Sequence, residues 1–331
     1  MPNYRIADLI VNLNCSGRTA KQAEPYLTDN SLTPDFSISI SQSEIEAARV
    51  HNPLLSDEEW EYILSATAFY RNLIKFNGFM LHASAILYQA RAYLFSAPSG
   101  TGKSTHTNLW QAQFGKDKVR ILNDDKPAIR RIGETVYAFG TPWSGKHDIS
   151  IPIGVPIAGI CFLERAENNS ITKLSSREAL PNLFSQTLRR LPEEDLDILS
   201  DELSNLLSNI PIYKLNCNIT NEAAIIAERA MNRPTANITA DPNRSPLSIR
   251  EGYSLCIKAG SNIIACQDDS QFIGLTTLNT TGVFLFKQLQ AGATKESLTS
   301  NLAQEYKIKP EVAEKDVDHF INSLKKLKIL I

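Results

Sequence analysis

The sequence contains few cysteines, and they are not arranged for cross-linking or for binding zinc. Its 331 residues include five, at positions 15, 161, 217, 256 and 266. The number is odd, the positions are scattered, and no two cysteines have the C-x-x-C spacing of a zinc or redox motif. The pattern predicts reduced thiols in a cytoplasmic protein and argues against a disulfide framework.

The sequence also lacks an excess of charge of one sign and any long apolar run. It has 34 Lys and Arg residues against 36 Asp and Glu residues, a formal net charge of −2. Such a balance gives no global attraction to nucleic acid or to an anionic membrane. The amino terminus lacks the basic-then-apolar layout of a signal peptide, and no window holds the roughly 18 apolar residues that span a bilayer. We therefore expect no nucleic-acid partner and no membrane segment.

The length suits two or three domains, each of roughly 100–150 residues. Apolar periodicity and composition change along the chain in a way that suggests four segments. We predict an N-terminal α/β region (1–75), a central α/β domain (76–232), a linker rich in Pro, Asn, Thr and Asp (233–245), and a tail of short strands followed by three amphipathic helices (246–331).

The stretch "SAPSGTGKST" departs from the Walker A pattern G-x-x-x-x-G-K-[ST] at one position, where Ala97 replaces the first glycine. In such a loop the backbone N–H groups surround phosphate oxygens, the lysine reaches the β and γ phosphates, and the hydroxyl binds Mg²⁺. An alanine is tolerated if its φ is negative. The alternative is a glycine-rich turn that matches by chance. Because the loop lies between a predicted strand and a predicted helix, we expect it to bind the phosphates of a nucleotide through Ser99, Gly100, Thr101, Gly102, Lys103, Ser104 and Thr105.

Two adjacent aspartates, Asp124 and Asp125, follow the apolar run "VRIL" and lie 20 residues or slightly more beyond Ser104. Phosphoryl transfer requires an acidic group near the phosphate loop, to hold Mg²⁺ and to orient or deprotonate the nucleophile. An Asp-Asp pair at the end of a strand is by itself usually a solvated turn. Its position shortly after a phosphate loop favours the functional interpretation.

Three segments in this order, "MLHASA" with His82, "APSGTGKST" and "NDD", resemble the HPr kinase/phosphorylase family. That family shares its nucleotide-binding core with the ATP-dependent phosphoenolpyruvate carboxykinases, and the resemblance covers roughly residues 76–232. It implies an α/β phosphate-loop core and ATP-dependent phosphorylation of a serine hydroxyl with Mg²⁺.

The resemblance also implies roles for individual residues. One aspartate would act as the base and the other would help to hold Mg²⁺. We favour Asp124 as the base and Asp125, with Ser104, near the metal, although the sequence does not rank the two aspartates. His82 would lie beside them and either contact phosphate or tune their pKa values, the alternative being a hydrogen-bonded core histidine.

The chain departs from the family further along. HPr kinases carry a Leu-Glu-Ile-Arg-Gly segment where this chain has "FGTPWSGKHDIS", so Lys146 is the catalytic cation that we expect there, and a solvated loop lysine is the alternative. The change argues against HPr as the substrate and weakens the case for a reverse phosphorolysis reaction. The G-T-P-W-x-G-K form resembles divergent members that accompany peptide-modifying gene sets. HPr kinases form hexamers, which leaves a homo-oligomer as one option.

The tail resembles the PqqD-like peptide-recognition domain, which has a winged-helix-like fold. The features that carry the resemblance are "LNTTG" at a helix start, "AGATKESL" and a final helix rich in leucine and lysine, within residues 246–331. In that family a sheet edge accepts a leader peptide as an added strand. The receiving edge would lie between about Tyr253 and Leu275. A dimerisation or capping domain is the alternative, and a DNA-reading domain is disfavoured because the helices lack a concentrated basic face.

Together these features predict an ATP-dependent kinase that phosphorylates a Ser or Thr hydroxyl of a ribosomally synthesised precursor peptide. The tail would bind the leader of that peptide and raise the effective concentration of the acceptor at the active site. Two alternatives stay open. One is a kinase of a small-molecule hydroxyl, and the other is a non-catalytic leader-binding scaffold with a regulatory nucleotide site.

Overall fold

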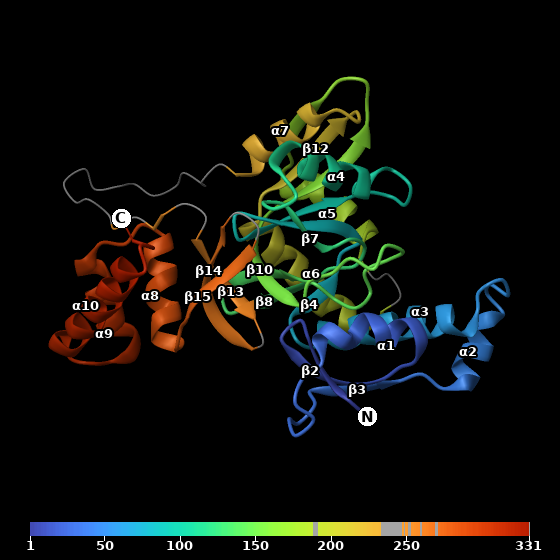
Figure 1. The fold of residues 1–331 in the computed structure, drawn as a ribbon, viewed down its shortest axis with the longest axis horizontal. Coiled ribbons are helices and arrows are strands. Elements are labelled where there is room, and N and C mark those ends of the chain that lie inside the picture. The colour runs from blue at the N-terminus through green and yellow to red at the C-terminus, as the bar shows by residue number, and fades with distance from the viewer. Residues whose placement is uncertain are drawn as a thin grey trace.

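The computed structural model describes residues 1–187, 191–232, 247, 249–250, 253–258, 260–268 and 271–330. The predicted linker, residues 233–245, lies outside this described part. The α/β class is confirmed, because helices and strands alternate through the central part of the chain (Figure 1). No helix among the described residues is both long and apolar enough to cross a membrane.

The N-terminal region is a small α/β unit, drawn in blue in Figure 1. Its sheet has the order β1-β2-β3, with β1 antiparallel to β2 and β2 parallel to β3. The elements are β1 (Asn3–Ile6), β2 (Leu9–Asn14), α1 (Gly17–Ala23), the 3₁₀ turn η1 (Glu24–Tyr26), β3 (Phe36–Ser39), α2 (Gln42–Arg49) and α3 (Asp57–Ile74). Helix α3 begins at a capping box, in which Ser56 and Glu59 satisfy each other's backbone N–H groups.

A twelve-stranded sheet forms the centre of the molecule and extends into the tail. Its central strands are β4 (Gly78–Met80), β5 (Ala83–Tyr88), β6 (Arg91–Ser96), β7 (Arg120–Asn123), β8 (Ala128–Ile132), β9 (Thr135–Phe139), β10 (Ile153–Arg165), β11 (Ser170–Lys173) and β12 (Ile212–Cys217). Four helices accompany them: α4 (Lys103–Phe114), α5 (Ser176–Ser185), α6 (Glu193–Asn209) and α7 (Asn221–Met231).

Strand β10 connects the parts of this sheet. Its first residues pair antiparallel with β9 and with the tail strand β13 (Tyr253–Lys258). Its later residues pair parallel with β6, with a shift in register between Ile157 and Gly159, and with β12 from Ile160 onward. One long buried strand therefore joins the strand that leads into the phosphate loop to the strands of the tail.

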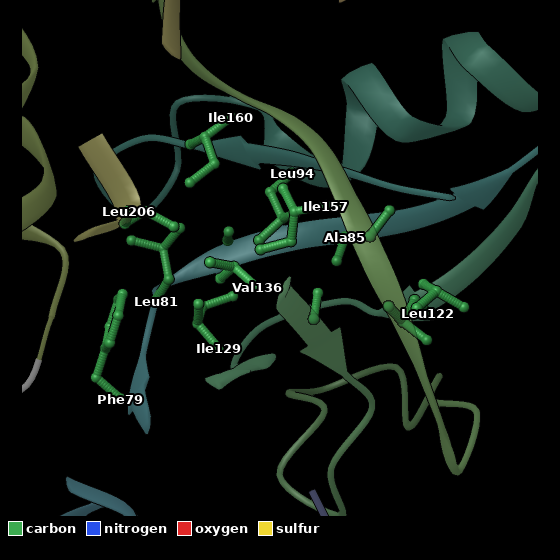
Figure 2. Close-up of a cluster of buried hydrophobic side chains, with 14 of the residues drawn as sticks. Phe79, Leu81, Ala85, Leu94, Leu122, Ile129, Val136, Ile157, Ile160 and Leu206 are labelled. Atoms are coloured by element: carbon green, nitrogen blue, oxygen red, sulfur yellow. The ribbon is translucent and has the colours of Figure 1, made fainter. Parts of the chain in front are cut away.

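The two faces of the central sheet are covered by different helices. On β6, Ala92 and Leu94 belong to the cluster of Figure 2, which includes residues of α5 and α6. Tyr93 and Phe95 point to the other face, where they pack with Trp110 of α4 and with residues of α7. This alternation is the two-residue period of a strand that is buried on both faces.

The N-terminal region shares a hydrophobic core with the central domain. Phe69 of α3 and Leu13 of β2 belong to the same buried cluster as Phe139 of β9 and Trp143. The ring centroids of Phe69 and Trp143 are 4.8 Å apart. The domain boundary expected at residue 75 stays a prediction, and this cluster continues across it.

The tail contains the three strands and three helices expected from its sequence. They are β13, β14 (Ser261–Asp268), β15 (Gln271–Thr277), α8 (Thr280–Gln290), α9 (Lys295–Tyr306) and α10 (Pro310–Lys326). Leu255 and Ile264 pack with the three helices, whereas Cys256 and Ile263 belong to the core cluster of the central sheet. The tail sheet is therefore packed between its own helices and the central domain, as Figure 1 shows.

The shared core predicts that a truncation in the N-terminal region destabilises the whole protein. Phe69→Ala should lower the free energy of unfolding by about 3–5 kcal/mol, because Phe69 is completely buried. The measurement is urea unfolding followed by circular dichroism. Thr67→Ala on the same helix is the control and should change stability little, since it removes only one methyl group and an exposed hydroxyl that bonds Ile63 O. A separate unfolding transition for the N-terminal region would contradict a shared core.

Candidate functional site

The phosphate loop runs from the end of β6 into the start of α4. Gly100 and Gly102 have φ values of +79° and +120°, which favour glycine over residues with a side chain. Ala97 is not among the residues with positive φ, so the condition under which alanine is tolerated is confirmed. Its methyl group is buried in the cluster that contains Phe95 and Trp110. The replaced glycine thus lies where the backbone does not require one.

The loop is held in shape by a residue distant in the sequence. Arg165, at the end of β10, donates hydrogen bonds to the carbonyl oxygens of Thr101, at 3.0 Å, and of Gly100. Helix α4 has no side-chain cap at Gly102, so its first N–H groups are free of side-chain capping partners. Sequence reasoning missed Arg165, and no local pattern indicates it.

Lys103 is buried at the first position of α4. Its ammonium donates to the Ala97 carbonyl at 3.1 Å and lies 3.0 Å from His82 Nε2. Burial lowers the pKa of Lys103, and the nearby charges of Asp125 and Asp124 oppose that shift. Lys103 therefore lies close enough to the two aspartates for their charges to act on it.

The two aspartates follow β7 and have different surroundings. Asp124 is buried and accepts hydrogen bonds from Ser84, at 2.7 Å, and from Ser104 of the phosphate loop, at 3.2 Å. Asp125 is half-buried; its Oδ1 lies 3.4 Å from His82 Nε2, and its Oδ2 pairs with Lys126. Ser104 therefore donates a hydrogen bond to Asp124. The expected pair of metal ligands was Ser104 and Asp125.

The surroundings of Asp125 stabilise its ionised form over its protonated form. Burial by itself raises its pKa, but the hydrogen bond from His82 and the charge of Lys126 outweigh it and lower the pKa to about 2. Its turn is fixed by Asn123, whose side-chain oxygen accepts from the backbone N–H groups of Asp125 and Lys126 at 3.0 and 2.7 Å. Asn123 was not selected from the sequence, although it is part of "NDD".

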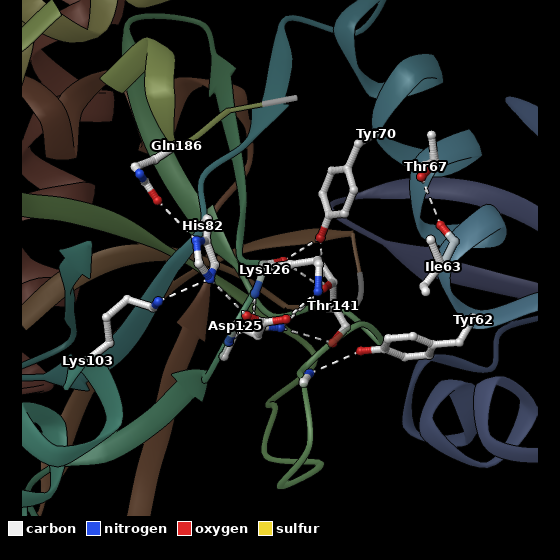
Figure 3. Close-up of polar contacts among 12 residues, drawn as sticks. Tyr62, Ile63, Thr67, Tyr70, His82, Lys103, Asp125, Lys126, Thr141 and Gln186 are labelled. Atoms are coloured by element: carbon white, nitrogen blue, oxygen red, sulfur yellow. Dashed lines mark hydrogen bonds and ion pairs between the residues drawn. The ribbon is translucent and has the colours of Figure 1, made fainter. Parts of the chain in front are cut away.

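His82 lies between β4 and β5 and not within a strand. Its backbone N–H donates to Gln186 O at 2.8 Å, and its ring Nδ1 is 3.0 Å from Gln186 Oε1. Nε2 is thereby directed between Lys103 and Asp125 (Figure 3). Because a ring nitrogen either accepts or donates a hydrogen bond, Nε2 serves Lys103 or Asp125 but not both at the same time.

The loop that carries Lys146 is positioned by the N-terminal region. Gly145 N–H donates to the hydroxyl of Tyr62 at 3.0 Å, and Arg18 donates to Gly145 O. The Arg18 guanidinium also lies 4.2 Å from the centre of the Tyr62 ring. Sequence reasoning left the role of residues 1–75 open, and these contacts supply one.

The same loop lies directly against Asp125. Gly145 has φ +80°, and a Cβ added there would lie 2.8 Å from the Asp125 Cβ, so a side chain does not fit. Lys146 follows Gly145 and is exposed; within the described residues it has no hydrogen-bond or ion-pair partner. The structure thus brings Lys146 next to the site but not into contact with the aspartates.

An open groove of about 730 Å³ borders these groups. Its lining combines the phosphate loop, the acidic turn and the end of α5: Met80, His82, Pro98, Ser99, Asp125, Lys126, Ser185, Gln186 and Thr187. Asp124 does not line it. The groove is open to solvent, and Asp125 is part of its wall.

The donor set near the phosphate loop suits Mg²⁺. Ser104 Oγ and the carboxylate of Asp124 are adjacent oxygens, and Mg²⁺ is usually held by one or two carboxylates, substrate phosphates and water. In the described part of the chain no group of three or more His, Cys, Asp or Glu residues forms a metal cage. Oxygens supplied by a nucleotide would complete such a site.

The lowered pKa of Asp125 predicts an acid-dependent loss of stability. Because the folded pKa, about 2, is below the ordinary value of 3.8, the contribution is fully present above about pH 5 and is lost as the pH falls toward 2. Urea unfolding between about pH 5 and 3 should show a steeper decline for the wild type than for Asp125→Asn. Asp201→Asn, at an exposed position on α6, is the control and should follow the wild type. Parallel curves for the wild type and Asp125→Asn would contradict the assignment.

Comparison with known proteins gives two similarities. Residues 273–330 match the family described as coenzyme PQQ synthesis protein D (PqqD). Among solved structures, the Hpr(Ser) kinase/phosphatase from Coxiella burnetii is similar at 12% sequence identity and a TM-score of 0.26, over 46% of this chain and 94% of that chain. Comparison with curated protein sequences gives no match. Both resemblances noted in the sequence are found again. The PqqD-like one is found over residues 273–330, and the HPr-kinase-like one is weak.

Proposed function

We propose that the protein is an ATP-dependent kinase that phosphorylates a Ser or Thr hydroxyl of a ribosomally synthesised precursor peptide. The observation that carries the proposal is the groove in which Ser99 of the phosphate loop, His82 and Asp125 meet, with Lys103 directly behind His82. A phosphate held by the loop and a hydroxyl entering the groove would lie side by side there. Positioning and charge neutralisation supply most of the catalysis in such transfers.

The surroundings of the two aspartates favour the reverse of the roles first expected from the sequence. Asp125 lines the groove, so its carboxylate can reach an acceptor hydroxyl, which is the first requirement for a general base. Asp124 is turned inward to Ser84 and Ser104, where it would hold Mg²⁺ with the serine hydroxyl. Consecutive residues after a strand point to different sides, and "NDD" alone does not say which side each takes.

In the proposed transfer the acceptor oxygen forms a bond to the γ-phosphorus as the bond to the β–γ bridging oxygen breaks and ADP leaves. The hydroxyl proton passes to Asp125. Bound Mg²⁺ would neutralise charge on the β and γ phosphates. Lys103 would turn from Ala97 O and His82 to the phosphate, which would leave His82 Nε2 to interact with Asp125.

The tail offers an edge for a leader peptide. Within the described residues β15 pairs with β14 only, whereas β14 is flanked on both sides and β13 meets β10. A cavity of about 420 Å³ lies beside the end of β15, between the start of α8 and α10. An added strand along β15 with a side chain in this cavity is the peptide-binding mode that the geometry favours. We therefore narrow the receiving edge to β15.

The two alternatives differ from this proposal in what is phosphorylated. A small-molecule kinase would use the same groove with a metabolite hydroxyl, and a scaffold would bind both nucleotide and leader without transfer. The first of two experiments separates the three functions, and the second tests the peptide site in the tail.

The first experiment changes the groove carboxylate. Asp125→Asn should reduce ATP-dependent labelling of the precursor peptide by about 10²–10⁴-fold, because the acceptor hydroxyl loses its base and its orienting group. ATP binding and precursor binding should persist. Phosphopeptide mass spectrometry with ATP and Mg²⁺ is the measurement, and Asp201→Asn is the control. Labelling of a metabolite but not of peptide would support the small-molecule kinase, and no labelling at all would support the scaffold.

The second experiment tests the tail cavity. Leu327, which lines it, and Val312, which does not, are 38% and 47% exposed at the two ends of α10. Leu327→Asp should weaken precursor binding more than about tenfold, because a charge replaces an apolar contact. It should raise the KM for the precursor and leave kcat at saturation unchanged. Val312→Asp is the matched control, and an equal loss in both variants would contradict binding at this cavity.

A further inference from the structure

A cavity of about 210 Å³ lies where the N-terminal region, the central sheet and the tail meet. Its walls come from β1 and the β1–β2 turn, from the segment after η1, from β9 and β10, and from β13 with the turn that follows it. It shares no lining residue with the groove or with the cavity beside β15. The proposed function therefore leaves this cavity without a role.

One wall of the cavity carries two opposite charges. Arg5 of β1 and Asp8 in the β1–β2 turn both border it, and Arg5 Nη1 lies 3.6 Å from Asp8 Oδ1. That distance allows an ion pair but is longer than a hydrogen bond. Among the described residues no group donates a hydrogen bond to Asp8 Oδ1, although this oxygen is buried. Buried charged atoms are normally hydrogen-bonded as well as paired, so this wall can still accept a polar ligand.

The surrounding backbone fixes both charged groups in place. Ala7 and Asp8 have φ values of +52° and +60°, and their carbonyl oxygens accept from Arg130 at 2.9 and 3.3 Å. Arg5 lies against the tail at Gly260, where an added Cβ would be 2.7 Å from Arg5 Nη1. Burial raises the pKa of Asp8 despite the charges of Arg130 and Arg5. A further cation would therefore stabilise its carboxylate.

The other walls of the cavity are apolar. Phe139 of β9 and Ile257 of β13 are buried and border it. Leu27, which follows η1, also borders it and is 55% exposed although it is a large apolar residue. Small-molecule sites usually combine such an apolar lining with a few placed polar groups, and drug-sized ligands occupy about 300–1,000 Å³. This smaller cavity suits a smaller ligand, which would cover Leu27.

We propose that the cavity binds a free α-amino acid with an apolar side chain. Such a molecule carries its ammonium and its carboxylate on one carbon atom, so its two charges are adjacent. The charged atoms of Arg5 and Asp8 are adjacent too. The ligand carboxylate would accept from Arg5, and the ligand ammonium would donate to Asp8. The ligand side chain would lie along Phe139 and Leu27.

The paired charges disfavour other small ligands. Phosphate or a simple carboxylate would meet the like charge of Asp8, and a simple amine would meet the like charge of Arg5. A residue in the interior of a peptide has neither an ammonium nor a carboxylate on its backbone. A free amino acid supplies both charges and an apolar group at once.

A bound amino acid would connect the three parts of the chain. It would touch Arg5 of the N-terminal region, Phe139 of the central sheet and Ile257 of the tail. Because the three walls come together only in the folded protein, the ligand would bind the folded state alone. The Tm should then rise with ligand concentration.

The first experiment identifies the charges that the ligand needs. The full-length protein is titrated with L-valine, L-leucine, L-methionine and L-phenylalanine up to about 10 mM, by calorimetry and by thermal unfolding. At least one of them should bind and raise the Tm. For the tightest, the acid without its ammonium, the amine without its carboxylate and the neutral N-acetyl amide should each bind at least about tenfold more weakly.

The second experiment changes the cavity. Asp8→Asn removes the charge, and asparagine tolerates the positive φ of this position, so the turn is kept. It should weaken amino-acid binding by at least about tenfold. Leu27→Asp should cause a similar loss from a surface position, because it charges the apolar wall. Leu54→Asp is the matched control, since Leu54 is 91% exposed and does not line the cavity.

Three results would each overturn the inference. They are no binding of any of the four amino acids, equal affinity for the N-acetyl amide and the free amino acid, and no loss of affinity in Leu27→Asp relative to Leu54→Asp. Tighter binding of the acid or the amine alone would assign the cavity to an ion of one sign and also overturn it. The titrations use neither nucleotide nor peptide, so their outcome is independent of the proposed function.

Discussion

The carboxylate of Asp125 is the point at which contacts from the central domain and, through Gly145, from the N-terminal region converge. It is held by His82 and Lys126 of the central domain, and Gly145 lies against it under the control of Tyr62 and Arg18 from the N-terminal region. Burial opposes its charge, so its ionised state depends on these neighbours. The N-terminal region thereby positions one wall of the candidate site, and it shares a hydrophobic core with the central domain.

The phosphate loop shows where glycine is required and where it is not. Positive φ occurs at Gly100 and Gly102, whereas Ala97 continues from β6 with its methyl group packed in the core. The departure from the Walker A pattern therefore falls at a position where a Cβ contributes to packing. Arg165, at the end of β10, also stabilises the loop, because its guanidinium donates hydrogen bonds to two loop carbonyls.

The parts of this site that the sequence predicts are those with local signals. The glycine-rich loop, helix α4 and the acidic turn after β7 each follow from a few consecutive residues. The contacts that orient them join distant residues: Gln186 bonds His82 across 104 positions, and Tyr62 bonds Gly145 across 83. The different sides taken by Asp124 and Asp125 also follow from tertiary packing. No local sequence pattern encodes such long-range pairs, so they could not be predicted before the structure was known.

The attachment of the tail has a consequence for how a bound peptide would be presented. Alternate residues of β13 and β14 face opposite ways, so that Leu255 and Ile264 pack with the tail helices while Cys256 and Ile263 pack with the central domain. A tail tethered only by a linker would sample many orientations, but one that shares a core cluster is restricted. Since β13 pairs with β10, and β10 also pairs with the strand that leads into the phosphate loop, a leader added to β15 would join the same continuous sheet. Peptide binding and phosphate binding would then be related by a fixed geometry, and the length of peptide between leader and acceptor would decide which hydroxyl reaches Asp125.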